Sequence, residues 1–430
     1  LRVGMKTASP TTTVTLVRKK LDSPVDLLAL WANSQVTQKA YWAIPEQDFE
    51  FVALGVCASF KTNDRRNRFQ RIRELIEEVE INVEGDAGPE FSAGVLIGGF
   101  SFSNRQIERH PNWSAFGGGE LVLPEIFAIR SGKETWITRT EGSEIPDLNG
   151  TLSSDLGWTT KPDHQTDPAY LRLVSSALRE IEAGLMDKVV TARSLTISAD
   201  LSAGAVLRRL KQRHPSCATF AFTQGTQVFL GASPERLVGV DQDRVETAAL
   251  AGSRPRHEHP GADARLRAEL LADPKERREH EIVIRDIKDC LNAAGVRLNE
   301  PITTGVMKLR QIQHLHTPIS GSLPTSGRIL DLVEVLHPTP AVAGLPRESA
   351  QDWIDDNEAM DRGWYAAPIG WMTLDGSGEF RVALRSALLT RDSLTLFAGG
   401  GIVEGATPAQ ELAETATKFE ALLGALDLSP

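Results

Sequence analysis

Strand-like segments and amphipathic helices are mixed along this chain, and this mixture restricts the possible folds more than any other feature of the sequence. β-Branched and aromatic runs bounded by glycine-rich turns predict strands at residues 91–102, 120–130, 135–140, 188–197, 218–223, 227–231, 237–240 and 245–248. Apolar residues at helical spacing predict helices at residues 66–79, 167–184, 202–213, 264–271 and 275–293. Such a mixture predicts α/β or α+β layers rather than an all-β barrel.

The last part of the chain adds a predicted hairpin and a closing helix. Residues 366–374 and 379–390 flank a glycine-rich turn, and residues 408–426 have helical periodicity. Between them, a strand at residues 394–398 runs into three glycines, 399–401. A triple glycine is typical of a bulge or tight turn, although its backbone N–H groups can also approach a carboxylate closely. Residues 142–166, rich in Gly, Ser, Asp and Pro, are expected to form a surface connection.

Charge and cysteine content exclude several classes of protein. The chain has 47 basic and 57 acidic residues, a net charge of −10, which argues against nucleic acid as the main partner. A small anionic substrate stays possible because a few cations inside a cleft can override the global sign. The three cysteines lie far apart, so neither a disulfide framework nor a structural zinc site is expected. Without a long apolar run, the sequence predicts a soluble, cytoplasmic protein with no membrane association.

Two predicted helices carry carboxylates at spacings that place them on one face. Glu411, Glu414 and Lys418 lie at i, i+3 and i+7 on the closing helix. Glu276 and Glu279 lie at i and i+3 on the helix predicted at 275–293. Two such helices facing each other can hold a hard divalent cation such as Mg²⁺. The alternative interpretation is that each is an ordinary solvated face with surface ion pairs.

Three further polar residues occupy positions where chemistry is possible. Lys188 opens a strand, where a lysine is commonly a solvated edge residue, whereas a catalytic lysine needs burial or nearby positive charge. Glu235 follows a Ser-Pro turn at a strand end, where it is either a site residue or merely exposed. His314 and His316 share one face of a predicted strand; without a third ligand nearby, packing is favoured over metal binding.

Eight segments, taken in order, resemble one enzyme family. They are KVVTAR (188–193), GASPERL (231–237), ETAALAGSRPR (246–256), DPKERREHEI (273–282), HL (314–315), LHPTPAVAGLP (336–346), GGGIV (399–403) and ELAETATK (411–418). This series is similar to the chorismate-utilising enzymes, which comprise isochorismate, salicylate, anthranilate and aminodeoxychorismate synthases. The resemblance is dense over about residues 165–426 and is closest to the isochorismate synthases of menaquinone or siderophore synthesis.

The resemblance implies a fold of anthranilate synthase component I type. This is a single large α/β (α+β) domain of two stacked, mainly antiparallel sheets with helices outside. Residues 1–165 are then expected to complete the sheets, and residues 166–430 to form the chorismate-binding catalytic region.

The resemblance also implies a role for each site residue. Lys188 would deprotonate a water that attacks ring carbon 2 of chorismate, and Glu235 would protonate the hydroxyl leaving ring carbon 4, with His314 beside them in the catalytic set. Glu279 and Glu414 would bind Mg²⁺, with Glu276 and Glu411 nearby. Residues expected to contact the substrate are Gly252, Ser253, Tyr365, Arg385, Gly400, Gly401 and Lys418. Two positions depart from the usual pattern: Ser253 replaces a commoner Thr, and Gly400 a commoner Ala.

Within the family, Lys188 favours water over ammonia as the nucleophile, which disfavours the anthranilate and aminodeoxychorismate synthases. Residues 336–346 look more like isochorismate synthases than salicylate synthases. The resemblance therefore implies an isochorismate synthase, an isomerase, acting as a monomer without a glutaminase subunit. Two alternatives stay open: a salicylate synthase, which goes on to eliminate pyruvate, and a catalytically silent binding or regulatory protein on the same fold.

Overall fold

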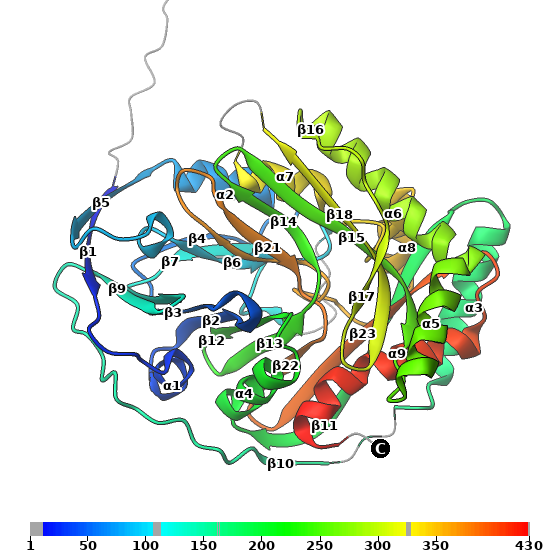
Figure 1. The fold of residues 1–430 in the computed structure, drawn as a ribbon, viewed down its shortest axis with the longest axis horizontal. Coiled ribbons are helices and arrows are strands. Elements are labelled where there is room, and N and C mark those ends of the chain that lie inside the picture. Colours follow the sequence, from blue (N-terminus) through cyan, green and yellow to red (C-terminus); the bar gives the residue numbers. More distant parts are fainter. Residues whose placement is uncertain (1–11, 106–112, 161, 163, 324–327, 429–430) are drawn as a thin grey trace, which may run out of the picture.

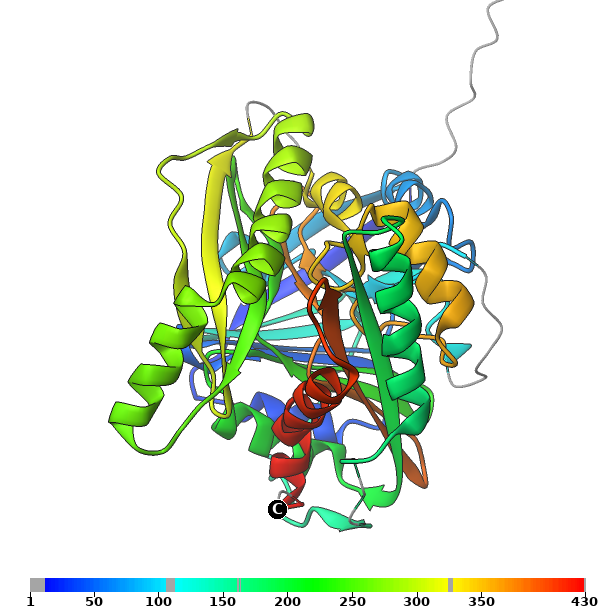
Figure 2. The ribbon, with the colours of Figure 1, turned by 90° about the vertical axis from the view of Figure 1, so that its right-hand side faces the viewer.

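The computed structural model describes residues 12–105, 113–160, 162, 164–323 and 328–428. Two large sheets dominate it, and helices pack around them (Figures 1 and 2). Of the strand pairs formed by the described residues, only β1–β5 is parallel. The predicted fold class, one mixed α/β unit of two mainly antiparallel sheets with helices, is confirmed.

The larger sheet contains strands from both ends of the chain. Its order is β10 (Gly157–Thr159), β11 (Lys188–Leu201), β23 (Ser393–Val403), β22 (Ser386–Leu389), β13 (Gln227–Ser233), β12 (Ala218–Gln224), β2 (Gln38–Ile44), β3 (Phe49–Leu54), β8 (Ile126–Ser131), β9 (Glu134–Thr140), β1 (Thr12–Lys20) and β5 (Val79–Gly85). The short β19 (Gly344–Leu345) pairs with β11.

The smaller sheet is also assembled from distant segments. Its order is β16 (Arg297–Leu298), β18 (Ile312–Ser322), β15 (Arg244–Pro255), β14 (Arg236–Asp241), β21 (Gly378–Val382), β20 (Pro368–Met372), β6 (Leu96–Phe100), β7 (Gly119–Leu123) and β4 (Ala58–Thr62). β17 (Gly305–Lys308) pairs with β18. Strands before residue 165 therefore belong to both sheets, together with later strands.

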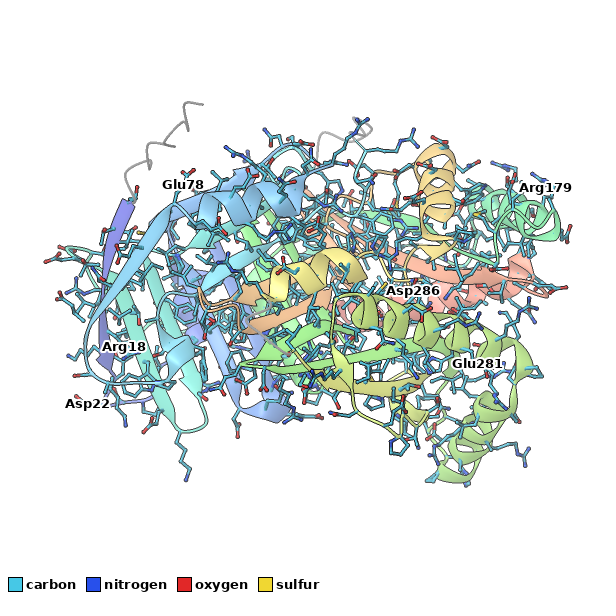
Figure 3. The ribbon with its side chains drawn as sticks, turned by 90° about the horizontal axis from the view of Figure 1, so that it is seen from above. Arg18, Asp22, Glu78, Arg179, Glu281 and Asp286 are labelled. Carbon is cyan, nitrogen blue, oxygen red and sulfur yellow. The ribbon has the colours of Figure 1, made fainter. Side chains whose placement is uncertain are left out.

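The helices are α1 (Leu27–Asn33), α2 (Arg68–Ile76), α3 (Pro168–Glu182), α4 (Ala203–Arg213), α5 (Pro260–Ala272), α6 (Pro274–Ala293), α7 (Ile329–Leu336), α8 (Arg347–Asn357) and α9 (Pro408–Leu423). Short 3₁₀ turns occur at Pro45–Gln47, Glu90–Ser92 and Gly424–Leu426. Seen from above, α6 runs along the outside of the molecule with Glu281 and Asp286 labelled on it (Figure 3). No described helix combines the length and apolarity that a membrane crossing requires.

Two apolar clusters hold the sheets in place, one on each face of the larger sheet. On β2, Trp42 belongs to the cluster that also contains Phe100 and Phe380 of the smaller sheet. Its neighbour Tyr41 belongs to the second cluster, with residues of α1 and α4. Because successive side chains of a strand point to opposite faces, β2 is buried on both sides.

Several of the predicted helices and connections are present in the structure, and the residues at their ends explain their bounds. The helix predicted from Asp167-Pro168 is α3, and the Asp167 carboxylate accepts a hydrogen bond from the backbone N–H of Tyr170 at 2.9 Å. The helix predicted at 66–79 is shorter, because the chain leaves it after Ile76 and enters β5 at Val79. In the predicted surface connection at 142–166, residues 161 and 163 lie outside the described part; the structure adds the short edge strand β10.

Three predictions about strands were wrong. The segment 120–130 is two strands in different sheets, β7 and β8, because Pro124 cannot donate to a ladder. The second arm of the hairpin predicted at 379–390 also divides: β21 stays in the smaller sheet, and β22 joins the larger one after Arg385, whose φ is 49°. Glycines 399–401 are neither bulge nor turn, but lie inside β23 with continuous pairing to β11.

Candidate active site

Most of the predicted site residues line one cavity. Those on its wall are Glu235, Gly252, Ser253, Glu279, His314, Tyr365, Arg385, Gly401, Glu414 and Lys418. The wall is built from β11, β15, β18, β23, α6 and α9 together with the loops before β14, β19, β20 and β22. Four predicted residues lie outside that wall: Lys188, Glu276, Gly400 and Glu411.

Lys188 is the first residue of β11 and has no exposed surface. Its Nζ donates to Glu279 Oε1 at 2.9 Å, so the strand and α6 meet through a buried ion pair. Gly401 of β23 provides the space for this pair, because a Cβ there would lie 2.3 Å from Glu279 Oε1 and 3.0 Å from Lys188 Cε. The interpretation of Lys188 as a solvated edge residue is therefore wrong.

Glu235 lies between β13 and β14 and is buried, so it is not an exposed turn residue. Its backbone is fixed on both sides, since its N–H donates to Ser233 Oγ at 3.2 Å and its C=O accepts from Val382 N–H at 3.1 Å. Burial raises the pKa of the carboxyl to about 7, although the charges of Lys188 and Arg385 act in the opposite direction. A carboxyl with this pKa can carry a proton near neutral pH and donate it.

His314 connects two elements of the wall. Its Nε2 lies 3.1 Å from an Arg385 NH2 nitrogen, and its Nδ1 lies 2.9 Å from Ser253 Oγ. Burial, and then the charge of Arg385, lower the pKa of this imidazole to about 3, so it is neutral at physiological pH. Among the described residues, no carboxylate forms an ion pair with Arg385, which leaves its guanidinium available to an anion in the cavity.

A bulge in β15 shapes the side of the cavity next to α6. The register of β15 against β18 shifts between Ala251 and Ser253, and Gly252 between them has a φ of 76°. This left-handed conformation favours glycine. It directs the backbone N–H of Ser253 to Glu276 Oε2 at 2.7 Å, so the bulge is joined to the start of α6.

All four predicted metal-binding carboxylates form ion pairs with lysines, and Lys275 pairs with two of them, Glu411 and, at 3.6 Å, Glu276. Glu279 accepts from Lys188 at 2.9 Å, Glu414 from Lys418 at 2.7 Å and Glu411 from Lys275 at 3.0 Å. Glu411 Oε2 is buried without a hydrogen-bond partner. With the lysines in these positions, no group of three His, Cys, Asp or Glu side chains in the described part of the chain is close enough to hold an ion.

The carboxylates nevertheless influence one another strongly. Burial and then the charge of Glu279 raise the pKa of Glu276 to about 7. Burial and the charge of Glu414 also raise the pKa of Glu411. Burial alone would raise the pKa of Glu414, but Lys418, together with Lys275 and His314, lowers it. Mutual repulsion of this kind, with one buried oxygen left without a partner, fits a donor set for a hard cation.

Tyr365, Lys418 and Gly400 are the remaining predicted residues, and each has different surroundings. Tyr365 is buried on the cavity wall and stacks on Phe397, with ring centroids 5.2 Å apart. Lys418 Nζ also donates to the C=O of Gly399 at 2.7 Å, which ties α9 to β23. Gly400 faces away from the cavity, because a Cβ there would lie 2.8 Å from Glu411 Oε2.

Arg362, a buried cation that lines the cavity, was not among the residues predicted from the sequence. It forms a buried ion pair with Glu358 and donates 2.8 Å hydrogen bonds to the C=O groups of Val190 and Val342. Arg362 therefore fastens β11 to the loop before β19. The i, i+4 spacing of Glu358 and Arg362 was the signal available in the sequence, but that spacing is typical of exposed helix pairs.

The fold and the site define a class that comparison with known proteins identifies. The sequence matches the family described as "Chorismate binding enzyme" over residues 4–427, so the chain belongs to that family. Isochorismate synthase MenF of Bacillus subtilis (strain 168) is 34% identical, covering 94% of this chain and 91% of the relative. The salicylate biosynthesis isochorismate synthase of Pseudomonas aeruginosa is 36% identical, covering 94% and 87%. Among solved structures, the menaquinone-specific isochorismate synthase MenF from Escherichia coli matches with a TM-score of 0.79 at 27% identity, covering 98% of this chain and 96% of the other.

Proposed function

We propose that this protein is an isochorismate synthase that converts chorismate to isochorismate. The observation that carries the proposal is one cavity bounded by a buried acid with a pKa of about 7, Glu235, and by an arginine without a carboxylate partner, Arg385. Lys188 lies directly behind this wall. The similarity to isochorismate synthases over 94% of the chain supports the same conclusion.

The reaction adds water at ring carbon 2 and removes the hydroxyl at ring carbon 4. Lys188 acts as the base that takes a proton from water, and the water oxygen forms a bond to carbon 2. The ring double bonds shift, the bond from carbon 4 to its hydroxyl breaks, and Glu235 donates the proton with which that hydroxyl leaves as water. One water enters and one leaves, so the product is an isomer of the substrate. Arg385 holds a substrate carboxylate during these steps.

Magnesium is the proposed cofactor, with Glu279 and Glu414 as ligands and Glu276 and Glu411 nearby. The mutual repulsion of these carboxylates and the unpartnered Glu411 oxygen support a divalent cation at this position. When bound, the ion supplies positive charge that orients and neutralises a substrate carboxylate. Lys418 holds Glu414 in place through its ion pair.

The test is a single assay resolved by product. Purified protein is incubated with chorismate and Mg²⁺, and the products are separated by chromatography. Isochorismate as the product supports the proposal. Salicylate formed without a second enzyme would replace it with a salicylate synthase, and chorismate binding without turnover would indicate a silent binding protein.

We extend the proposal to the domain organisation of the chain, its location in the cell and its partners. Residues 1–165 complete the two sheets and residues 166–430 carry the chemistry, so the N-terminal part has no separate activity. The enzyme acts as a monomer in the cytoplasm, without a glutaminase subunit, membrane or nucleic acid as a partner. The three free cysteines support a reducing compartment such as the cytoplasm, and the net charge of −10 supports the absence of a nucleic-acid partner. Sedimentation of the purified protein tests the monomer.

A further inference from the structure

The hydrogen bonds around His314 have only one consistent direction. The Arg385 guanidinium can only donate, so His314 Nε2, 3.1 Å away, must accept. A neutral imidazole that accepts at Nε2 carries its proton on Nδ1. That proton points to Ser253 Oγ at 2.9 Å and to the Gly252 C=O at 3.3 Å.

The same chain of hydrogen bonds continues from His314 to Ser253, which lines the cavity. Its Oγ accepts from His314 and, among the described residues, has no other hydrogen-bond partner. The Ser253 hydroxyl proton is therefore free to donate to a ligand, since Ser253 lines the cavity. At the other end of this chain of hydrogen bonds, Arg385 donates one N–H to His314 and itself lines the cavity. Each end of this chain of hydrogen bonds therefore has a donor available to a ligand.

We propose that His314 is a positioning residue that fixes Arg385 and Ser253 as two separate donors toward the substrate, with Arg385 directed to a carboxylate. The inference rests on the proposed function for the identity of that substrate, and it gives His314 an orienting role within the catalytic set. Orientation is needed here because Arg385 follows β21 in a left-handed conformation, with φ 49°, at the point where the chain leaves one sheet for the other. A long, flexible side chain at such a corner requires a fixed acceptor to hold one rotamer.

The burial of His314 suits this role. Only 5% of the residue is exposed, and its ring stays neutral because burial and Arg385 lower its pKa to about 3. A histidine that transfers protons works best with a pKa near the operating pH. His314 is thus a permanent acceptor toward Arg385 and a permanent donor toward Ser253.

The tautomer is tested in the unliganded protein, independently of any activity. Nitrogen-15 NMR of histidine-labelled protein resolves the two ring nitrogens, and the signal lost in His314→Gln assigns this residue. We expect the Nδ1–H tautomer from pH 6 to pH 8. An Nε2–H tautomer or an imidazolium would overturn the proposal.

Kinetics test the positioning role with a matched series. His314→Phe keeps a ring but removes both hydrogen bonds, and we expect KM for chorismate to rise about tenfold or more while kcat changes little, because a hydrogen bond to a charged group is lost. His314→Gln retains an acceptor toward Arg385 and should recover part of this loss. His316→Gln, two residues along the same strand, is the control. A fall in kcat at unchanged KM in His314→Phe would instead show proton transfer and overturn the proposal.

The Ser253 end of this chain of hydrogen bonds has its own pair of variants. Ser253→Thr keeps the hydroxyl and should leave KM close to that of the native protein, whereas Ser253→Ala should raise it. Equal KM values in Ser253→Ala and the native protein would contradict a donor at this position. If the native protein fails to convert chorismate, the proposed function fails, yet the NMR result still decides the tautomer. If His314→Phe does not fold, the NMR measurement and His314→Gln carry the test.

Discussion

Lys188 Nζ and Glu279 Oε1 lie 2.9 Å apart, in an ion pair whose lysine has no exposed surface. The proposed base and a proposed metal ligand are therefore in direct contact, although 91 positions separate them in the sequence. Because the two groups are in contact, any displacement of Glu279 also changes the surroundings of the Lys188 amine. The pair therefore links the proposed metal site to the proposed base.

The first prediction concerns Lys188→Ala. Without the amine, water addition should fall by about two to four orders of magnitude, the usual contribution of a positioned base. Chorismate should still bind, because Arg385 on the cavity wall is unchanged. Product formation by chromatography and chorismate binding by calorimetry check the two parts. Lys133→Ala, at an exposed position, is the control. Retained isomerisation in Lys188→Ala would show that another group acts as the base.

The second prediction concerns the pH dependence of activity. Glu235 acts as an acid only while protonated, and burial raises its pKa to about 7. The value of kcat/KM should therefore fall as pH rises through about 7. A pH profile of the native enzyme measures this limb, and Glu235→Gln should lose most activity at every pH. A profile that stays flat up to pH 9 would remove Glu235 from the role of acid.

The third prediction follows from the same pKa but concerns stability. The folded protein holds the Glu235 proton up to about pH 7, whereas the unfolded chain releases it near the ordinary value of 4.5. The stabilisation from proton binding is complete below about pH 4.5 and is lost as pH rises through 7. Glu235→Gln lacks this loss, so at pH 8 its free energy of unfolding should exceed that of the native protein by up to about 3 kcal/mol. Denaturant titrations at pH 5 and pH 8 compare the two proteins, and a difference that does not grow with pH would contradict the assignment.

The part of this fold that could be predicted from sequence is the part with one buried face. α3 has a capping Asp167 and one apolar stripe, so its start and direction could be predicted. β2 was missed because Tyr41 and Trp42 are buried on opposite faces, which removes the period-two alternation that marks a strand. A strand buried on both sides is hard to recognise within one sequence.

The site also combines features that could be predicted from the sequence with features that could not. The carboxylates of α6 and α9 could be grouped by helical spacing, and the family resemblance assigned their roles. Their pairing with Lys188, Lys275 and Lys418 could not be predicted, since it depends on how β11, α6 and α9 are assembled in space. The corner at Arg385 was also hidden, because a left-handed arginine has no sequence signal.

The fourth prediction concerns Mg²⁺. Glu279→Gln and Glu414→Gln each remove one negative charge from the proposed ligand set and should shift the Mg²⁺ titration of activity to higher concentration. Even residues that only support a metal ligand cost about 10- to 100-fold in affinity when replaced, so we expect at least about tenfold here. Glu281→Gln, on the same helix but exposed and paired with Arg277, is the matched control (Figure 3). Calorimetry with Mg²⁺ alone gives a second readout, and titrations identical to those of the native protein would remove both residues from the ligand set.

The last prediction returns to the space around the Lys188–Glu279 pair. In Gly401→Ala, the new Cβ would lie 2.3 Å from Glu279 Oε1, closer than any non-bonded contact allows, so the carboxylate must move. Displacing catalytic groups by about 1 Å can cost about a hundredfold in rate, and we expect kcat to fall by about that factor. Overpacking should cost only about 1–3 kcal/mol of stability, so the variant should still fold. Gly305→Ala, where the nearest atom to a new Cβ is the His316 C=O at 3.9 Å, controls for the glycine change itself. If Gly401→Ala kept full activity and Mg²⁺ affinity, the contact between Lys188 and Glu279 would not matter to the reaction.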